Sequence, residues 1–404
     1  MKYDAPDKLR EIAGIFSSHS YSLYLVGGAV RDFLLGRKND DYDLTTSATP
    51  DEVKSMFRRT IDTGIKHGTV TVIYKGEHYE ITTFRTEGDY TDSRHPDSVT
   101  FVRSLEEDLK RRDFTINALA VDILTGSVID MHGGIEDLEN RTIRAIGEPE
   151  ERFHEDALRM MRACRFSSKL GFTIEEKTLS AIKDLHPAIR KVSVERIKEE
   201  MDKLLLSRCP VQGLGYLEET GLLGEIIPGL NLTDTILDAV GKAQKEKLPL
   251  SAFYAILFSD MDEEKVSGIL SRLRSSNSEK EDVCHIVRTW KYDEGKNTPY
   301  DARIFIHDNG KKILPSLFAV RKSLRDFTQE DEKFIAAVEN EIGRNSPVEI
   351  KDLAVRGTDL RGIVPPGPEV GKALSYLLEK VIDKPEYNTK EKLLGLVREA
   401  NLCS

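Results

Sequence analysis

The chain has 404 residues, with 59 Lys and Arg against 69 Asp and Glu and a formal net charge of −10. This acidic balance excludes a general coat for nucleic acid, because sequence-independent phosphate binding depends on Lys and Arg. Hydrophobic residues make up 39% of the chain, which is enough for packed cores and argues against disorder. A length of this order predicts two to four domains.

The sequence predicts a cytoplasmic protein with no membrane segment. Its apolar runs fall short of the roughly 18 residues that span a bilayer, and the polar, charged first ten residues do not resemble a signal peptide. Scattered cysteines without a Cys-x-x-Cys pair are typical of a reducing compartment and argue against structural zinc. The cysteines are Cys164, Cys209, Cys284 and Cys403.

Residues 1–146 mix the periodicities of strands and helices and are predicted to form a small α/β head with a β-sheet. The predicted elements, in chain order, are a helix at 9–16, a strand at 23–26, a helix at 30–35 and a hairpin of strands at 70–74 and 79–84. The polar stretch 86–99 is predicted to be a loop, and its length indicates a functional role.

From about residue 147 the apolar residues recur at helical spacing, so the fold class is predicted as α+β, a mixed head followed by helices. The predicted domains are a head at 1–146, a neck at 147–209, a body at 210–300 and a tail at 301–404. Residues 161–210 carry 11 Lys or Arg against 7 Asp or Glu. This local basic surface is also compatible with ordinary solvated helix faces.

The densest pattern is a strand that runs into Gly27 and Gly28, followed by Arg31 and then by Asp41 and Asp43. Glycines let backbone N–H groups approach a phosphate closely, and a helix N-terminus favours an anion. On a strand, Asp41 and Asp43 would share a face and repel unless a cation lay between them. Mg²⁺ prefers such oxygen ligands together with substrate phosphates, so a magnesium site is favoured over an exposed strand face.

A third carboxylate from a neighbouring strand often completes a two-metal site. Glu80, at the start of its predicted strand, is the candidate. A surface glutamate at a strand start is an equally good interpretation.

Five ordered motifs closely resemble the nucleotidyltransferase superfamily that includes DNA polymerase β. Within it, the chain resembles the bacterial (class II) tRNA nucleotidyltransferases, or CCA-adding enzymes, and their poly(A) polymerase relatives, over essentially its whole length. The motifs are 27–36 with Asp41 and Asp43, 111–118, 133–138, 155–166 and 195–199.

The resemblance implies template-independent transfer of CMP and AMP from CTP and ATP to the 3′ end of tRNA. It implies that Asp41 and Asp43 are the catalytic residues that hold Mg²⁺, that Gly27, Gly28 and Arg31 meet the triphosphate, and that the tail binds the tRNA elbow. No pattern indicates a protein partner.

The sequence contains a charged cluster that is predicted to bind the nucleotide, Arg111, Arg112 and Asp113. Arginines can bind phosphate, and an aspartate can accept from a ribose hydroxyl, which would favour ribonucleotides. Asp113 could also cap an apolar helix that follows it, and the two roles are compatible. Asn117 either assists this contact or is a buried structural amide.

Asp156 and Arg159 are predicted to share a helix face and to read the base. A carboxylate accepts from the exocyclic amine of cytosine or adenine, and a guanidinium donates to a ring acceptor. Uracil and guanine would leave Asp156 unpaired. Glu155 would fix Arg159, while Arg162 and Arg165 follow on the same helix as candidate nucleotide contacts. The alternative is an ordinary helix salt bridge.

Other activities remain open at this point. An A-adding enzyme and a poly(A) polymerase use the same motifs, although residues 371–404, with 6 Lys or Arg against 5 Asp or Glu, lack the basic excess usual in poly(A) polymerases. The presence of the 86–99 loop disfavours a CC-only enzyme. A tRNA-binding protein on the same scaffold would be expected to lack Asp41 or Asp43. Arg196 and Glu199 are expected to brace the neck.

Overall fold

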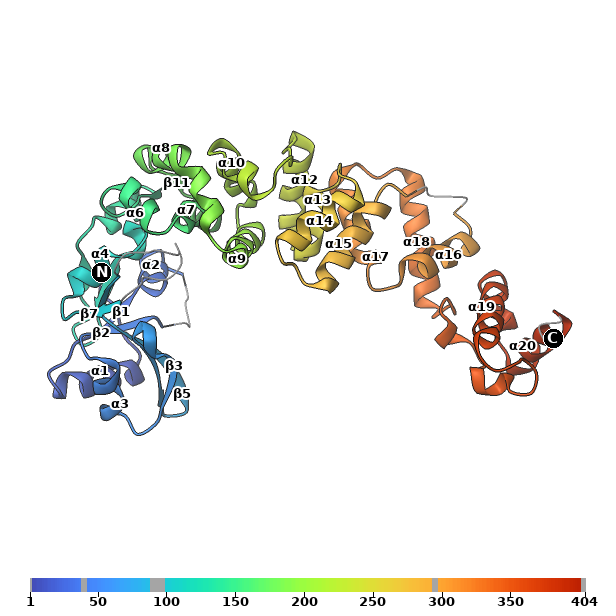
Figure 1. Ribbon diagram of the computed structural model, residues 1–404, viewed down its shortest axis with the longest axis horizontal. Coiled ribbons are helices and arrows are strands. Elements are labelled where there is room, and N and C mark those ends of the chain that lie inside the picture. The colour runs from blue at the N-terminus through green and yellow to red at the C-terminus, as the bar shows by residue number, and fades with distance from the viewer. Residues whose placement is uncertain (1, 38–41, 88–98, 293–296, 401–404) are drawn as a thin grey trace. The chain divides into compact units, whose positions relative to one another are not determined.

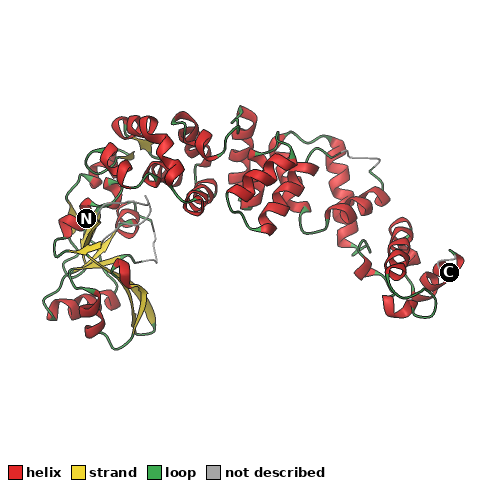
Figure 2. Ribbon diagram, viewed as in Figure 1, coloured by secondary structure: helices red, strands yellow, loops and turns green. Residues whose placement is uncertain are grey.

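The computed structural model describes the chain except for residues 1, 38–41, 88–98, 293–296 and 401–404. The described residues form two compact units, the first made of residues 1–231 with 272–274 and the second of residues 232–271 with 275–404. Within the described ranges, strands lie in the first unit, and the second unit consists of helices and loops (Figure 2). The predicted α+β fold class is confirmed.

A seven-stranded mixed sheet forms the centre of the head (Figure 1). The strand order is β3-β4-β5-β2-β1-β8-β9, in which β2 and β5 are parallel and the other neighbours are antiparallel. Its strands are β1 (Leu23–Val26), β2 (Leu44–Thr46), β3 (Thr60–Gly64), β4 (Thr69–Tyr74), β5 (Glu77–Thr83), β8 (Leu119–Asp122) and β9 (Val128–Asp130).

The predicted hairpin is present as β4 and β5. In β5, the alternate residues Tyr79, Ile81 and Thr83 are buried, which is the period-two pattern of a strand with one face on a core. The turn residues Lys75 and Gly76 have φ values of 48° and 83°, as tight two-residue hairpin turns require. The turn residues and the burial pattern therefore indicate the same pairing register for β4 and β5.

Short helices flank the sheet, and both predicted helices of the head are present. The head helices are α1 (Asp7–Ser18), α2 (Gly28–Leu34), α3 (Pro50–Met56), α4 (Leu105–Lys110) and α5 (Gly134–Glu139), with 3₁₀ turns η1 (Ile65–His67) and η2 (Thr115–Asn117). In α1, the buried residues Leu9, Ile12, Ala13 and Phe16 follow the helical repeat.

The prediction of a loop at 86–99 is wrong at its two ends. β6 (Arg85–Glu87) pairs antiparallel with β7 (Val99–Phe101) as a separate two-stranded sheet. Polar composition concealed these short strands, which pair only with each other. Residues 88–98 lie outside the described residues.

After the head, the first unit continues as helices. Its further elements are β10 (Thr142–Ile143), α6 (Pro149–Glu155), α7 (Leu158–Leu170), β11 (Thr173–Ile174), α8 (Glu176–Leu185), η3 (His186–Lys191), α9 (Val194–Leu205), α10 (Pro210–Glu219) and α11 (Leu222–Ile226). α7 is buried along almost its whole length and packs against α9 and α10. It is the helix around which the neck is built.

The second unit contains the remaining helices. They are α12 (Asp234–Lys245), α13 (Leu250–Leu257), α14 (Glu263–Arg272), α15 (Asn277–Thr289), α16 (Pro299–Asn309), α17 (Leu314–Leu324), α18 (Gln329–Gly343), α19 (Pro368–Asp383) and α20 (Lys390–Glu399), with 3₁₀ turns η4 (Ile350–Asp352), η5 (Gly357–Leu360) and η6 (Pro385–Tyr387). None of the helices described in either unit is long and apolar enough to cross a bilayer.

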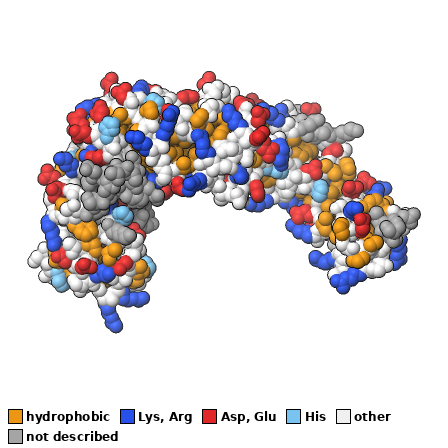
Figure 3. Space-filling model, viewed as in Figure 1, with side chains coloured by type: hydrophobic (Ala, Val, Ile, Leu, Met, Phe, Trp, Pro, Cys, Tyr) orange, Lys and Arg blue, Asp and Glu red, His pale blue; other side chains and the backbone are white. Residues whose placement is uncertain are grey.

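The molecular surface supports the inference from net charge. On the face shown in Figure 3, Lys and Arg side chains alternate with Asp and Glu. Such mixed charge is unlike the one-sign surface of a general nucleic-acid coat.

Two glycines of α10 provide a test of neck packing. A Cβ on Gly213 would lie 2.7 Å from Ser168 Cβ and 2.9 Å from Leu204 Cγ, whereas a Cβ on Gly215 would meet nothing within 4 Å. We expect Gly213→Ala to lower the free energy of unfolding of the first unit by about 1–3 kcal/mol through overpacking. Gly215→Ala should raise it by about 0.5–1 kcal/mol through helix propensity.

Urea unfolding followed by circular dichroism measures both variants. Equal effects of the two substitutions would contradict the described contact between α7, α9 and α10.

Candidate active site

The site begins at the edge of the sheet that is formed by the end of strand β1 and the starts of its two neighbours, β2 and β8. β1 runs antiparallel to both β2 and β8, so its last residue lies beside the first residues of those strands. The N–H of Val26 donates to the carbonyl of Asp43 (2.9 Å), and the N–H of Gly27 donates to the carbonyl of Leu119 (3.3 Å). The sheet therefore holds the backbone of Gly27 and Asp43 in one place.

The two predicted phosphate glycines lie at this edge. Gly27 has a φ of 66°, a conformation that glycine adopts without strain. A Cβ on Gly27 would lie 3.1 Å from Nη1 of Arg112 and 3.6 Å from Oδ2 of Asp43. Glycine at this position therefore leaves space beside a cation and a carboxylate. Gly28 follows as the first residue of α2.

Arg31 is buried and belongs to a chain of hydrogen bonds. Its Nε donates to Oδ1 of Asp32 (3.0 Å), and its Nη1 donates to Oδ1 of Asn117 (2.6 Å). The amide nitrogen of Asn117 donates in turn to Oδ1 of Asp113 (3.0 Å). Asn117 is thus a buried amide that links two predicted nucleotide residues, so its two interpretations are compatible.

Asp113 joins the head to α7. Its Oδ2 accepts from Nε (2.8 Å) and Nη2 (2.6 Å) of Arg162. Burial alone would raise the pKa of Asp113, but the Arg162 charge and the hydrogen bonds from Asn117 and Arg162 lower it to about 2. The carboxylate is therefore held in its charged form.

The prediction that Asp113 caps an apolar helix is wrong. The 3₁₀ turn η2 and then β8 follow, and the N-cap position belongs to Phe114. Asp113 accepts from the N–H of Phe114 (2.8 Å) and from Asn117. The apolar residues 118–121 form a buried strand, and a short apolar run does not distinguish such a strand from a helix.

Asp108 belongs to α4, and its fully buried carboxylate accepts hydrogen bonds from both Arg111 and Arg112. Arg111 Nε donates to Asp108 Oδ1 (3.0 Å), and Arg112 Nη2 donates to Oδ2 (3.3 Å). Burial would raise the pKa of Asp108, but the two arginine charges outweigh burial and lower it. Sequence reasoning missed Asp108, although its i,i+3 and i,i+4 spacing to the arginines was a usable signal.

Asp156 and Arg159 both face the cavity, but the predicted shared helix is wrong. Asp156 ends α6, and Arg159 lies in the first turn of α7. The helix breaks because Asp156 is extended (φ −144°, ψ 102°), and its Oδ1 accepts from the N–H of Leu158 (3.0 Å). Arg159 donates to Glu155 Oε2 (2.7 Å), the contact predicted for Glu155.

Arg196 contacts Asp156 directly. It was expected only to brace the neck, yet its Nη2 donates to Asp156 Oδ2 (2.7 Å) and its Nη1 lies 3.4 Å from Oδ1. The distance of 40 residues between the two positions gave no local signal of this contact. Glu199, the other expected brace, pairs with Lys203 on the same helix.

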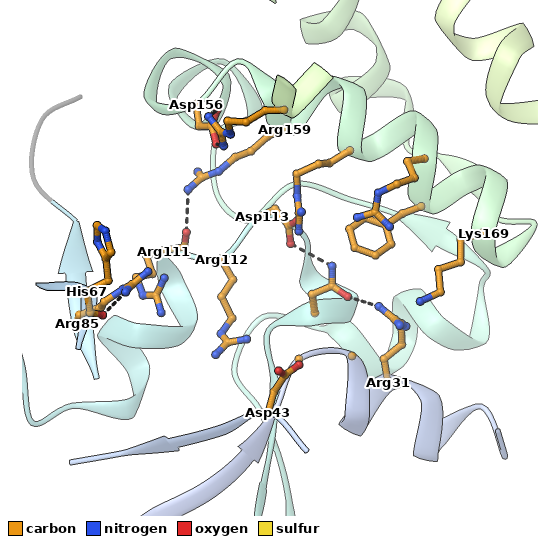
Figure 4. A pocket seen from close by; sticks show the side chains of 17 residues that line it. Arg31, Asp43, His67, Arg85, Arg111, Arg112, Asp113, Asp156, Arg159 and Lys169 are labelled. Atoms are coloured by element: carbon orange, nitrogen blue, oxygen red, sulfur yellow. Dashed lines mark hydrogen bonds and ion pairs between the residues drawn. The ribbon is translucent and has the colours of Figure 1, made fainter. Parts of the chain in front are cut away.

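These side chains line one cavity of about 710 Å³ (Figure 4). Asp156 and Arg159 lie at the top of the view, Asp43 and Arg112 below them, and Arg31 and Lys169 to the right. Eight arginines and one lysine face three aspartates, so the cavity suits a polyanion. Sequence reasoning missed five of its lining residues, which are His67, Arg85, Phe166, Lys169 and Arg196.

A smaller cavity of about 260 Å³ is lined by both Asp43 and Glu80. Two details of the sequence prediction are wrong, since Asp43 precedes β2 and Glu80 is the fourth residue of β5. Parallel pairing of Leu44 with Ile81 places the preceding residues, Asp43 and Glu80, at matching positions on adjacent strands.

Two carboxylates at a cavity beside the cationic groups fit a hard divalent cation, which prefers oxygen ligands. Asp41 lies outside the described residues. Among the side chains that the structure describes, no group of three or more His, Cys, Asp or Glu is close enough to hold a metal.

Three family models match the chain. One described as "Poly A polymerase head domain" matches residues 23–144, and one described as "Probable RNA and SrmB- binding site of polymerase A" matches residues 171–233. A third, for domain 2 of tRNA nucleotidyltransferases, matches residues 245–397.

Several similar proteins are CCA-adding enzymes. The chain is 41% identical to the CCA-adding enzyme of Lactobacillus helveticus over 92% of this chain and 91% of that protein. It is 39% identical to the CCA-adding enzyme of Enterococcus faecalis over 98% and 97%. The crystal structure of the Bacillus stearothermophilus CCA-adding enzyme in complex with CTP has a TM-score of 0.83 and 36% identity, over 98% of this chain and 97% of that one.

Identity near 40% over nearly the full length of both chains is accompanied by the matching head domain. The chain belongs to the family of CCA-adding tRNA nucleotidyltransferases.

Proposed function

We propose that the protein adds CMP, CMP and AMP to the 3′ end of tRNA from CTP and ATP, without a nucleic-acid template. The observation that carries this proposal is one cavity lined both by the carboxylate and guanidinium that we assign to the base and by the glycines that we assign to the phosphates. Asp156 and Arg159 lie on one side of it and Asp43 lies on the other, and Gly27 lies beside Asp43. A nucleoside triphosphate likewise has its base at one end and its phosphates at the other.

Asp156 would accept from the exocyclic amine of cytosine or adenine while Arg159 donates to a ring acceptor. Uracil and guanine present a carbonyl at this position, and a carboxylate facing a carbonyl leaves both groups without a hydrogen bond. Hydrogen bonds from the N–H of Leu158 and from the guanidinium of Arg196 fix the orientation of Asp156. Glu155 does the same for Arg159.

The triphosphate would lie along the backbone of Gly27 and Gly28, within reach of the cations of the cavity. Arg31 of α2, Arg162 and Arg165 of α7, and the pair Arg111 and Arg112 all line the cavity. The tRNA 3′-hydroxyl would attack the α-phosphorus in line and release pyrophosphate. Asp113 and Asn117 would lie beside the ribose and favour ribonucleotides.

We assign Mg²⁺ as the divalent metal, held by Asp41 and Asp43, with Glu80 as a candidate third ligand. When bound, it would lower the pKa of the attacking hydroxyl and neutralise charge on the triphosphate. The shared cavity of Asp43 and Glu80 supports this assignment.

The helical regions would hold the tRNA. The family models at 171–233 and 245–397 support RNA contacts in the neck, body and tail, with the elbow on the tail at 301–404. We keep the boundaries 1–146, 147–209, 210–300 and 301–404 as the proposed functional division. The three cysteines that the structure describes are scattered and free, which fits a cytoplasmic location.

The first prediction from the proposed function concerns the activity itself. Purified protein is incubated with Mg²⁺ and with tRNA that ends at the discriminator base or in CC, together with CTP, ATP or both. We expect ordered addition of C, C and A, resolved by sequencing gel. Addition of AMP only to the CC-ended tRNA would favour A-addition instead, and long A tails would favour a poly(A) polymerase. No incorporation would refute an enzyme.

The second prediction concerns the metal. Asp43→Asn should reduce kcat by a factor of about 100 or more, because it removes a ligand whose metal contributes several kcal/mol. The matched control Asp51→Asn, an exposed residue of α3, should keep its kcat. Retention of rate in Asp43→Asn at saturating Mg²⁺ would refute this role.

The third prediction concerns base choice. Asp156→Ala should lower the ratio of kcat/KM for CTP over UTP by roughly 10- to 100-fold, since an unsatisfied buried polar group costs about 1–3 kcal/mol. Asp184→Ala, at an exposed position of α8, is the control. An unchanged ratio, with both nucleotides slowed equally, would reduce Asp156 to a structural residue.

A further inference from the structure

Phe166 lies at the centre of an unusual cluster of cations. Three guanidinium carbons lie near its ring centroid, those of Arg165 at 4.0 Å, Arg162 at 5.3 Å and Arg31 at 5.5 Å. All three arginines and Phe166 line the large cavity. One aromatic ring therefore contacts cations from two separate helices, α2 and α7.

The ring itself is fixed in place. Phe166 is only 6% exposed and packs edge-on against the fully buried Phe114, with ring centroids 5.8 Å apart and an interplanar angle of 79°. This T-shaped geometry is a favourable one for two aromatic rings. Phe114 follows Asp113 directly, so the same segment that binds Arg162 also supports Phe166.

The ring and the nearby carboxylates act differently on the arginines. The three guanidiniums already have acidic partners: Asp32 pairs with Arg31, Asp113 pairs with Arg162, and Glu200 pairs with both Arg165 and Arg162. A further carboxylate would cancel positive charge that an anionic ligand needs. An aromatic face attracts a cation without carrying a formal charge, so it can hold the arginines near one another and leave the cavity cationic.

We propose that Phe166 is a positioning residue for nucleotide binding, whose ring arranges Arg31, Arg162 and Arg165 to receive the triphosphate. This inference rests on the proposed nucleotidyl transfer and extends it to a residue whose side chain has no polar atom. Phe166 acts on the phosphates through the three arginines, so its effect does not depend on the base.

Graded fluorination of the ring separates this role from packing. Fluorine withdraws electron density from the ring face and weakens cation binding while the shape changes little. We expect 4-fluoro-, 3,5-difluoro- and 3,4,5-trifluorophenylalanine at position 166 to raise KM for CTP and ATP stepwise and equally. Loss of the cation–π interactions in Phe166→Leu should raise both KM values roughly 5- to 20-fold with little change in kcat.

The matched control is Phe172→Leu, since Phe172 is equally buried, at 3% exposure, and does not line the cavity. It should leave both KM values unchanged. If Phe166→Leu raises KM but fluorination does not, the ring acts only by packing and the proposal is overturned. A fall in kcat alone would overturn it as well.

Pyrophosphate binding, measured by calorimetry, separates failure of this inference from failure of the proposed function. Its affinity should fall with fluorination by the same factor as KM rises. This readout requires no incorporation, so a wild-type protein that adds no nucleotide would refute the proposed function and leave the ring effect measurable. Unchanged pyrophosphate affinity across the series would overturn the role of Phe166.

Discussion

The buried carboxylate of Asp113 is the interaction on which the rest of the site depends. It accepts from Asn117 in the head and from two nitrogens of Arg162 in α7. Arg31 joins the same chain through Asn117. A buried charge is tolerated only when it is paired and hydrogen-bonded, and here the partners come from both sides of the junction. Arg31 of α2 and Arg162 of α7 are thus coupled through one carboxylate.

Around this junction, acidic side chains hold the cations of the cavity in defined positions. Asp108 of α4 supports Arg111 and Arg112, Glu155 supports Arg159, and Glu200 supports two arginines of α7. Long arginine side chains would otherwise lose considerable conformational entropy when they bind an anion. Holding them before the ligand arrives reduces this cost, which is the general advantage of a preorganised polar site.

Local patterns predicted the local structure well. The strand at 23–26, the hairpin at 70–84 and the long helices of the neck follow from period, turn residues and burial. Motif order also gave most of the residues that line the cavity, including Asp156 and Arg159. The helix break at Asp156 was missed, because a hydrogen bond from the N–H of Leu158 and an ion pair from distant Arg196 stabilise an extended residue there.

Contacts between distant segments were beyond sequence reasoning. Lys169 and Phe166 follow the predicted arginines on α7, yet only the packing of α7 against the head brings them to the cavity. Glu80 was named as a candidate neighbour of Asp43, but the strand pairing that brings the two positions together, parallel β2 and β5, was not predicted. Side-chain type indicates what a residue can bind, whereas the neighbours that it meets are set by tertiary structure.

The position of Asp156 has a consequence for how the pocket distinguishes its ligands. An ionised carboxylate offers about four acceptor positions. The N–H of Leu158 occupies one of them, and the two terminal nitrogens of Arg196 approach two more. One acceptor position is left for a ligand. In the proposed function, Asp156 would therefore accept a single amine hydrogen, and this one acceptor would take the place that a complementary base holds in templated synthesis.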